Sequence, residues 1–350
     1  MLAKQKQLFI FGSTGDLVKR KVIPALSRLK DLDLKVITLG RKNLDSESYR
    51  SLVCGDNCSE DFIKKHVYSV INFEDKEICR DCNIYLDKDN VNYFYSALPP
   101  KNIGDVIRYV GRLKYEGYPI SLLIEKPFGS SLKEAISLKK LIDEEKLSEN
   151  VLISDHYLFK KEVMNLPLIP FKKIKIVSLE KVGLENRISY YDGVGALKDM
   201  IQSHFLNIFL KLLKNSKEIL HTFEIISYER AQYGNGIDEG YVKDLGKSSD
   251  TETFVKVNGK VGDINFEFVT GKKFDEKISY ISIDDDKIIL NDLENPYIRL
   301  FEDFLSDKRE GFLDMETSML GWELTELIQL KESRLSFYKE GSNYLDLGFE

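Results

Sequence analysis

The sequence predicts a protein of two domains, an α/β domain followed by an α+β domain. In residues 1–170, apolar strand-like runs alternate with helix-like segments, which is typical of a doubly wound, mostly parallel sheet. The first of these strands passes directly into a glycine-containing turn and a helix. In residues 171–350, short alternating strands separated by glycine turns predict a largely antiparallel sheet accompanied by helices.

Length and composition set the broad class of the protein. The 350 residues are 43% hydrophobic and 31% charged, as in an ordinary globular protein with room for two cores. The formal net charge of -6 argues against nucleic acid as a main partner. No apolar run approaches the ~20 residues of a membrane span, and the N-terminus lacks the small-residue cleavage site of a signal peptide. We therefore expect a cytoplasmic protein without a membrane partner.

The first strand and its turn predict a dinucleotide site. Residues 7–11 form a short apolar run, and the turn that follows is Gly12-Ser13-Thr14-Gly15-Asp16-Leu17. A strand, a glycine turn and a helix together present backbone N–H groups and a helix N-terminus to a pyrophosphate. The motif is GxxG rather than GxGxxG, with Val18 at the third position, and is weak when taken alone. Together with the alternating strands and helices it predicts a Rossmann-type domain.

The second strand indicates which coenzyme is bound. It spans residues 34–39 and ends in Gly40-Arg41-Lys42. Sites that prefer NAD commonly place Asp or Glu here for the ribose 2′-hydroxyl, whereas an arginine accommodates a 2′-phosphate. Arg41 therefore favours NADP over NAD, and the alternative interpretation is an exposed loop charge.

The remaining strands of the first half also end in chemically distinctive residues. Apolar runs at 91–98, 120–124 and 151–153 alternate with helix-like segments near 102–117 and 131–147. The second of these runs ends in Glu125-Lys126-Pro127-Phe128-Gly129. The third is followed by Asp155, His156, Tyr157 and Lys160, in a chain with only four histidines. The carboxyl ends of parallel strands share the edge where ligands bind, so these clusters predict a ligand site; the alternative is solvated loop.

In the second half, a strand at 174–179 precedes a long helix at 193–213. The apolar stripe of this helix leaves out Asp199 and His204, which are five residues apart and are expected to bracket a face rather than to stack one turn apart. For His204, a structural and a functional role both stay open. Further strands are expected at 253–257, 263–270 and 277–283, with turns at Asn258-Gly259 and Thr270-Gly271, and helices near 296–306 and 314–330.

The four cysteines form two close pairs, Cys54 with Cys58 and Cys79 with Cys82. Two such pairs about twenty residues apart resemble the spacing of a structural zinc site. The alternative is four reduced thiols in or near two helices. The glycine turns of a metal knuckle are missing nearby, and we expect no metal in the functional site.

Seven segments in order resemble the glucose-6-phosphate dehydrogenase family. They are GSTGDLVKRKVIPALSRL (12–29), LGRKNL (39–44), YFYSALPP (93–100), EKPFG (125–129), DHYLFKKEVMNL (155–166), EKVGLENRISYYDGVGALKDMIQSH (180–204) and TGKKFDEK (270–277). The resemblance spans nearly the whole chain, which is shorter than typical members. It implies oxidation of glucose 6-phosphate at C1 to the 1,5-lactone, NADP or NAD as the coenzyme, and a homodimer.

The resemblance also implies a role for individual residues. His204 would be the general base, oriented by Asp155, and Lys126 would lie near the reacting carbon. The sugar phosphate would be held by His156, Tyr157, Lys160 and Lys277. The sugar hydroxyls would be bound by Lys126, Glu180, Asp199 and Lys272. The cofactor would contact Gly12, Thr14, Gly15, Asp16, Leu17, Arg41 and Lys126.

Two departures from the family pattern concern the substrate end. Phe159 replaces a small glycine and Lys161 replaces an acid. The alternatives are therefore a relative that acts on another hexose 6-phosphate, an oxidoreductase of the Gfo/Idh/MocA type, which shares the EKP motif, and a regulator that binds nucleotide or sugar phosphate without turnover.

Overall fold

The chain divides into two compact units in this computed structural model. The model describes residues 5–29, 33–54, 58–73, 79, 82–167, 170–213, 221–291 and 293–348. The first unit comprises Met1–Phe159 and Glu294–Met319, and the second comprises Lys160–Leu293 and Leu320–Glu350. A single boundary near residue 170 was expected from the sequence. The chain instead passes into the second unit at Lys160 and returns to the first with residues 294–319.

The first unit is built on a six-stranded parallel sheet in the order β3-β2-β1-β4-β5-β6. Its strands are β1 (Lys6–Phe11), β2 (Leu34–Gly40), β3 (His66–Val70), β4 (Asn92–Ser96), β5 (Ile120–Glu125) and β6 (Val151–Ser154). All adjacent strands pair in parallel. The order reverses direction between β1 and β4, and ligands of open α/β sheets bind outside the carboxyl ends of the strands at such a point.

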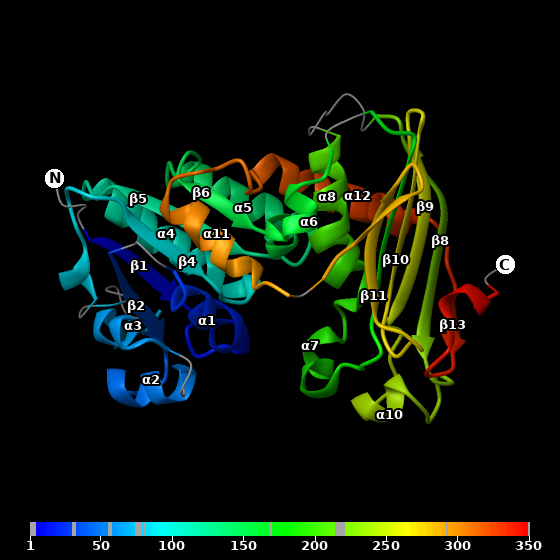
Figure 1. The fold of residues 1–350 in the computed structure, drawn as a ribbon, viewed down its shortest axis with the longest axis horizontal. Coiled ribbons are helices and arrows are strands. Elements are labelled where there is room, and N and C mark those ends of the chain that lie inside the picture. The colour runs from blue at the N-terminus through cyan, green and yellow to red at the C-terminus, as the bar shows by residue number, and fades with distance from the viewer. Residues whose placement is uncertain are drawn as a thin grey trace. The chain divides into compact units, whose positions relative to one another are not determined.

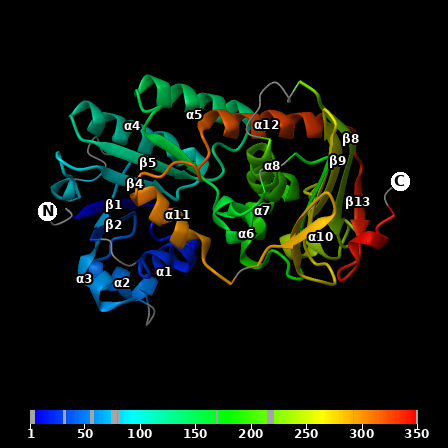
Figure 2. The ribbon, with the colours of Figure 1, turned by 45° about the horizontal axis from the view of Figure 1, so that its top comes forward.

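Helices cover both faces of this sheet. They are α1 (Ile23–Leu26), α2 (Ser46–Cys54), α3 (Glu60–Lys65), α4 (Ile103–Tyr115), α5 (Leu132–Glu144) and α11 (Pro296–Leu305). Figures 1 and 2 show α4 and α5 on one side of the strands and α1 and α2 on the other. Segment Val18–Val22, directly before α1, is a π-helix. Pro24 lies in the first turn of α1 and has no backbone N–H to donate, so the helical hydrogen bonds are interrupted where the two segments join.

The second unit is built on a seven-stranded sheet in the order β12-β11-β7-β10-β9-β8-β13. Its strands are β7 (Lys173–Leu179), β8 (Phe223–Tyr233), β9 (Phe254–Val261), β10 (Ile264–Gly271), β11 (Ile278–Ile283), β12 (Asp286–Ile289) and β13 (Leu335–Tyr338). Four adjacent pairs are antiparallel, and β10 with β7 and β13 with β8 are parallel. The expected combination of a Rossmann-type domain and a largely antiparallel domain is confirmed.

Both faces of the second sheet are covered by apolar packing. On one face lies a continuous helix made of the π-helix η6 (Leu197–Phe205) and α8 (Leu206–Leu212). Phe205 and Phe209 of this helix pack against Phe268 of β10; Figure 1 shows α8 beside the sheet. On the other face, a cluster centred on β7 and β10 includes Tyr191 of α7 (Ile188–Tyr191) and Tyr241 of α10 (Tyr241–Leu245).

One turn expected from the sequence is wrong. Asn258-Gly259 lies inside β9, and the hairpin turns at residues 262–263 instead. Gly259 pairs directly with Phe266 of β10, and a Cβ on Gly259 would stand 2.3 Å from that ring. The glycine therefore makes room for an aromatic side chain, a recognised way to stabilise a glycine within a sheet. Likewise, Thr270-Gly271 ends β10 rather than forming a turn of its own.

None of the described helices is long and apolar enough to span a bilayer.

Candidate active site

The glycine turn lies at the carboxyl end of β1, as expected. Gly12 has a φ of +80°, and a Cβ there would stand 2.9 Å from the carbonyl oxygen of Ala97 beyond β4. Only glycine tolerates both constraints. The Gly15 N–H donates to the Gly12 carbonyl at 2.9 Å, which closes the turn, and Gly15 and Asp16 are exposed. This exposed turn before a helix fits a dinucleotide pyrophosphate.

Two tyrosines that the sequence analysis missed support this region. The Tyr49 hydroxyl of α2 donates to the Ser13 carbonyl at 2.8 Å, and the Tyr68 hydroxyl of β3 donates to the Lys42 carbonyl at 2.7 Å. The two rings stack with centroids 4.5 Å apart. They therefore connect the glycine turn to the loop that carries Arg41, which is exposed directly after β2. No carboxylate occupies the end of β2, where NAD-preferring sites commonly place one.

A buried carboxylate joins the ends of four elements in the first unit. Glu125 at the end of β5 is buried and accepts hydrogen bonds from three hydroxyls. They are those of Tyr95 on β4 (2.5 Å), Ser154 on β6 (2.7 Å) and Tyr297 on α11 (3.1 Å). Burial raises the pKa of Glu125, and the hydrogen bonds and the charge of Lys126 offset this only in part. The next residue, Lys126, is thus attached to a firmly held strand end.

The segment after β6 places the expected substrate-binding side chains of the first unit. Asp155 is buried, and its carboxylate accepts the Tyr157 N–H at 2.9 Å. The His156 ring stacks on Tyr297 with centroids 5.5 Å apart and an interplanar angle of 18°. Tyr297 therefore contacts both Glu125 and His156. No role was expected for Tyr297 from the sequence, and it belongs to residues 294–319, far along the chain from Glu125 and His156.

Phe159 turns into the core of the first unit. It is 2% exposed, and its ring packs 4.8 Å from that of Phe312. A Cβ on Gly311 would stand 2.7 Å from the Phe159 ring, so a glycine at 311 accommodates the larger residue. The substitution that departs from the family pattern is thereby absorbed by packing within this unit.

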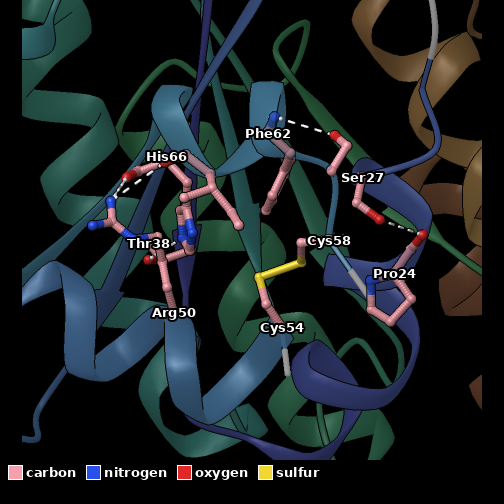
Figure 3. The surroundings of a disulfide bond; sticks show 10 residues. Pro24, Ser27, Thr38, Arg50, Cys54, Cys58, Phe62 and His66 are labelled. Atoms are coloured by element: carbon pink, nitrogen blue, oxygen red, sulfur yellow. Dashed lines mark hydrogen bonds between the residues drawn. A yellow bond between two sulfur atoms is a disulfide. The ribbon is translucent and has the colours of Figure 1, made fainter. Parts of the chain in front are cut away.

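The cysteines pair within each close pair. The structure joins Cys54 to Cys58 and Cys79 to Cys82 by disulfides, with Cα atoms 5.2 and 5.6 Å apart. Figure 3 shows the first pair between the end of α2 and the start of α3. Among the described residues, the four sulfurs do not gather into one cluster with metal-ligand spacing.

In the second unit, three expected substrate-binding residues lie at one end of the strands, Glu180 and Lys272 expected for the sugar hydroxyls and Lys277 for the phosphate. Glu180 follows β7, Lys272 follows the parallel β10, and Lys277 precedes the antiparallel β11, so all three are at the same end. The Lys272 ammonium pairs with the Glu180 carboxylate at 2.8 Å, and only 8% of the Lys272 side chain is exposed. Lys277 is exposed. A paired cation and anion beside an exposed lysine suit a polyhydroxyl ligand that carries an anionic group.

Lys160 begins the second unit. It is buried, and its ammonium donates to the Asn291 carbonyl at 3.1 Å.

The expected base lies on the π-helix. His204 is 2% exposed, and the Asp199 carboxylate lies 3.9 Å from the guanidinium of Arg187. The expectation that these two residues bracket a face assumed an α-helix. In a π-helix, hydrogen bonds run from residue i to i+5, as the Leu206 N–H does to the Ile201 carbonyl. Residues five apart therefore stand about one turn apart, and Asp199 and His204 share a face.

Comparisons with known proteins give one consistent family. The model of the glucose-6-phosphate dehydrogenase NAD-binding domain matches residues 9–165, and that of the C-terminal domain matches residues 161–225. The chain is 29% identical to glucose-6-phosphate 1-dehydrogenase of Buchnera aphidicola over 81% of this chain and 71% of the relative. It is also 29% identical to that of Bacillus subtilis, over 81% and 72%.

Solved structures agree in fold. A glucose-6-phosphate dehydrogenase in complex with its substrate glucose 6-phosphate superposes with a TM-score of 0.82 at 20% identity, covering 98% of this chain and 96% of that one. A Gfo/Idh/MocA family oxidoreductase from Vibrio cholerae gives 0.60 at 12% identity, covering 93% and 98%. The two family models together cover residues 9–225, more than half of the chain. This chain belongs to the glucose-6-phosphate dehydrogenase family.

Proposed function

We propose that the protein oxidises glucose 6-phosphate at C1 and transfers the hydride to NADP. The observation that carries the proposal is a set of ionisable residues. They lie in the segments that resemble the family motifs, and each unit fixes its own members in place. In the second unit these are the paired Glu180 and Lys272, the exposed Lys277 and the helix with Asp199 and His204. In the first unit they are Lys126, Asp155 and His156, around a buried carboxylate.

His204 is proposed as the general base that takes the proton from O1 of the sugar. An imidazole with a pKa near ~6.5 suits proton removal at neutral pH. Asp155 is proposed as the carboxylate that assists the base, as the acid does in a catalytic triad. A bound nicotinamide would supply the acceptor for the hydride from C1, while His204 takes the proton from O1, so that the sugar loses a hydride and a proton and becomes the 1,5-lactone.

The phosphate of the substrate needs cations in a protein whose net charge is -6. We assign this role to Lys160, Lys277 and His156, with the Tyr157 hydroxyl as a further hydrogen-bond donor. Lys126, Glu180, Asp199 and Lys272 would bind the sugar hydroxyls. Because Lys272 is paired with Glu180, a hydroxyl could accept from the ammonium and donate to the carboxylate at the same time.

NADP is proposed as the preferred coenzyme because of Arg41. The pyrophosphate would lie on the turn made of Gly12, Thr14, Gly15, Asp16 and Leu17, with Lys126 near the nicotinamide. An exposed arginine at the end of β2, where no acid stands, suits a 2′-phosphate. NAD would then bind more weakly, without that contact. The family resemblance also supports a homodimer, which light scattering of the purified protein would test.

The test follows nicotinamide reduction by absorbance. Glucose 6-phosphate is compared with glucose and with other hexose 6-phosphates, NADP with NAD, and wild type with His204→Ala. Turnover that needs the phosphate and collapses in the variant is expected. If glucose 6-phosphate gave no turnover while another hexose 6-phosphate did, the substrate would be that sugar. If no sugar phosphate were oxidised although NADP bound, the protein would be a binding protein rather than a dehydrogenase.

A further inference from the structure

We propose that Glu252 is a positioning residue that fixes the amino end of the helix carrying Asp199 and His204, and so sets the place of the base. The inference rests on the proposed function, because Glu252 would act through the proposed base. Glu252 belongs to none of the motifs that point to the site. It stands in the short segment that leads into β9.

Glu252 holds the start of the helix with two separate acceptors. Its backbone carbonyl accepts the Ala196 N–H at 3.1 Å, and its carboxylate oxygen Oε1 accepts the Leu197 N–H at 3.1 Å. The first N–H groups of a helix have no partner within the helix itself. A carboxylate at this end also interacts favourably with the helix dipole. One residue thus satisfies two consecutive donors at the start of a functional helix.

Gly195 makes room for this carboxylate. Its φ is +72°, a conformation that favours glycine, and a Cβ there would stand 2.3 Å from Oε1 of Glu252. Any side chain at position 195 would have to displace the carboxylate. The glycine and the acid therefore form one structural unit at the end of the helix.

The segment around Glu252 is itself anchored on both sides. The Thr251 hydroxyl donates to the Asp192 carboxylate at 3.0 Å and accepts the Gly193 N–H at 3.0 Å. The Thr253 hydroxyl accepts the Tyr233 N–H at 2.9 Å and pairs with the Tyr338 hydroxyl at 2.9 Å. Glu252 therefore stands on a rigid support, so that its contacts fix the helix rather than follow it.

The surroundings of Glu252 disfavour the charged form of its carboxylate. Burial raises the pKa of Glu252, and the Leu197 N–H and the charges of Arg230 and Lys198 offset this only in part. Burial chiefly raises the pKa of the Tyr191 and Tyr228 phenols, and the charge of Glu252 also contributes to raising it. A partly buried carboxylate without a salt bridge costs stability, and its hydrogen bond to the Leu197 N–H offsets part of that cost.

The position of the helix start bears directly on His204. Leu197 begins the short π-helix that carries His204 next to its last residue, and that last residue, Phe205, packs against Phe268. With one face packed and the amino end tied, the helix has little freedom to slide or turn. Misplacement of a catalytic group by about 1 Å can reduce turnover by roughly 10²-fold.

The kinetic test compares Glu252→Ala, Glu252→Gln and Gly195→Ala with the control Glu229→Ala. Glu229 is a partly buried acid on β8 whose side-chain partners are Ser227 and Lys256 rather than the helix. Glu252→Ala and Gly195→Ala should lower kcat by roughly tenfold or more and raise KM for glucose 6-phosphate, because Asp199 lies on the same helix, with KM for NADP within about threefold. Glu252→Gln keeps an acceptor for the Leu197 N–H and should keep most of kcat. A wild-type kcat in Glu252→Ala, or an equal loss in Glu229→Ala, would overturn the proposal.

A second measurement does not depend on activity. The imidazole proton signals of the four histidines are recorded by NMR, and those of His204 are identified by their absence in His204→Asn. In Glu252→Ala the His204 signals should shift, while those of His66, in the first unit, should stay in place. Unchanged His204 signals would refute the positioning role. If wild type failed to oxidise glucose 6-phosphate, the proposed function would fail, yet this spectrum would still decide on Glu252.

Discussion

His66 is expected to make the first unit sensitive to mild acid. It lies at the start of β3 and is 1% exposed. Its Nε2 pairs with the Thr38 hydroxyl at 2.9 Å, and Nδ1 has no hydrogen-bond partner among the described residues. Figure 3 shows the ring beside Thr38, with Arg50 bonded to the His66 carbonyl at 3.1 Å. Burial, together with the charge of Arg50, lowers the pKa of His66 from 6.5 to about 3.

The sign and size of the effect follow from this shift. The folded state keeps the imidazole neutral, whereas the unfolded chain takes up a proton below its pKa of 6.5. The stabilising contribution is therefore complete above pH 6.5 and is lost as the pH falls towards 3. Between pH 8 and pH 5, the titration of His66 therefore lowers the free energy of unfolding by about 2 kcal/mol. That is a large part of the free energy of unfolding of an ordinary domain.

The measurement is the free energy of unfolding in urea, followed by circular dichroism, at pH 8, 6 and 5. His66→Phe keeps an aromatic ring between Tyr49 and Phe62 but cannot titrate. It should lose about 2 kcal/mol less than wild type between pH 8 and 5. His221→Gln, at an exposed position, should keep the wild-type slope and serves as the control. If wild type and His66→Phe had the same dependence on pH, the assignment to His66 would be refuted.

Four further variants, at three positions, test other parts of the structure. Arg41→Ser should raise the KM for NADP by roughly 10- to 100-fold and leave that for NAD nearly unchanged, because it removes a charge-assisted bond to the 2′-phosphate; equal effects on both coenzymes would contradict this role. Tyr297→Phe keeps the ring on His156 but removes a hydroxyl donor to Glu125. The free energy of unfolding should therefore fall by about 1–3 kcal/mol, with KM for glucose 6-phosphate unchanged. Tyr297→Ala also removes the ring and should raise that KM. Gly259→Val should lower the free energy of unfolding by about 1–3 kcal/mol, since its Cβ meets Phe266, and an unchanged urea midpoint would disprove the contact.

The sequence predicted those parts of the fold that depend on local pattern. β1, β2, β5 and β6 appear within one or two residues of their expected bounds, because each is a short apolar run that ends in a polar residue or a turn. β3 and α2 were missed. Residues 66–70 include three polar side chains, His66, Tyr68 and Ser69, and their partners on β2 are thirty residues away in the sequence. Their place in the sheet follows from tertiary pairing rather than from local preference.

The geometry around the proposed base could not be predicted for a different reason. The apolar stripe of residues 193–213 was interpreted with an α-helical repeat, and the structure has a π-helix over Leu197–Phe205. Nothing in the residue types distinguishes the two, since the wider turn depends on what the helix is packed against and tied to. The same limit applies to Asn258-Gly259, where a typical hairpin dipeptide is drawn into a strand by the Phe266 ring.

Two supporting acids, Glu125 inside the EKPFG segment and Glu252 outside every motif, share a physical character that a sequence pattern does not show. Glu125 and Glu252 are both acids whose bound donors are neutral hydroxyls or N–H groups, and burial raises the pKa of each. Each supports a proposed functional residue. Glu125 fixes the strand end next to Lys126, and Glu252 fixes the start of the helix that carries His204. A side chain that touches substrate acts through its own chemistry, which its residue type can indicate. A side chain that places another is selected for its partners, which come from distant parts of the chain, as Tyr297 does for Glu125. The tertiary structure is therefore needed to find the second kind.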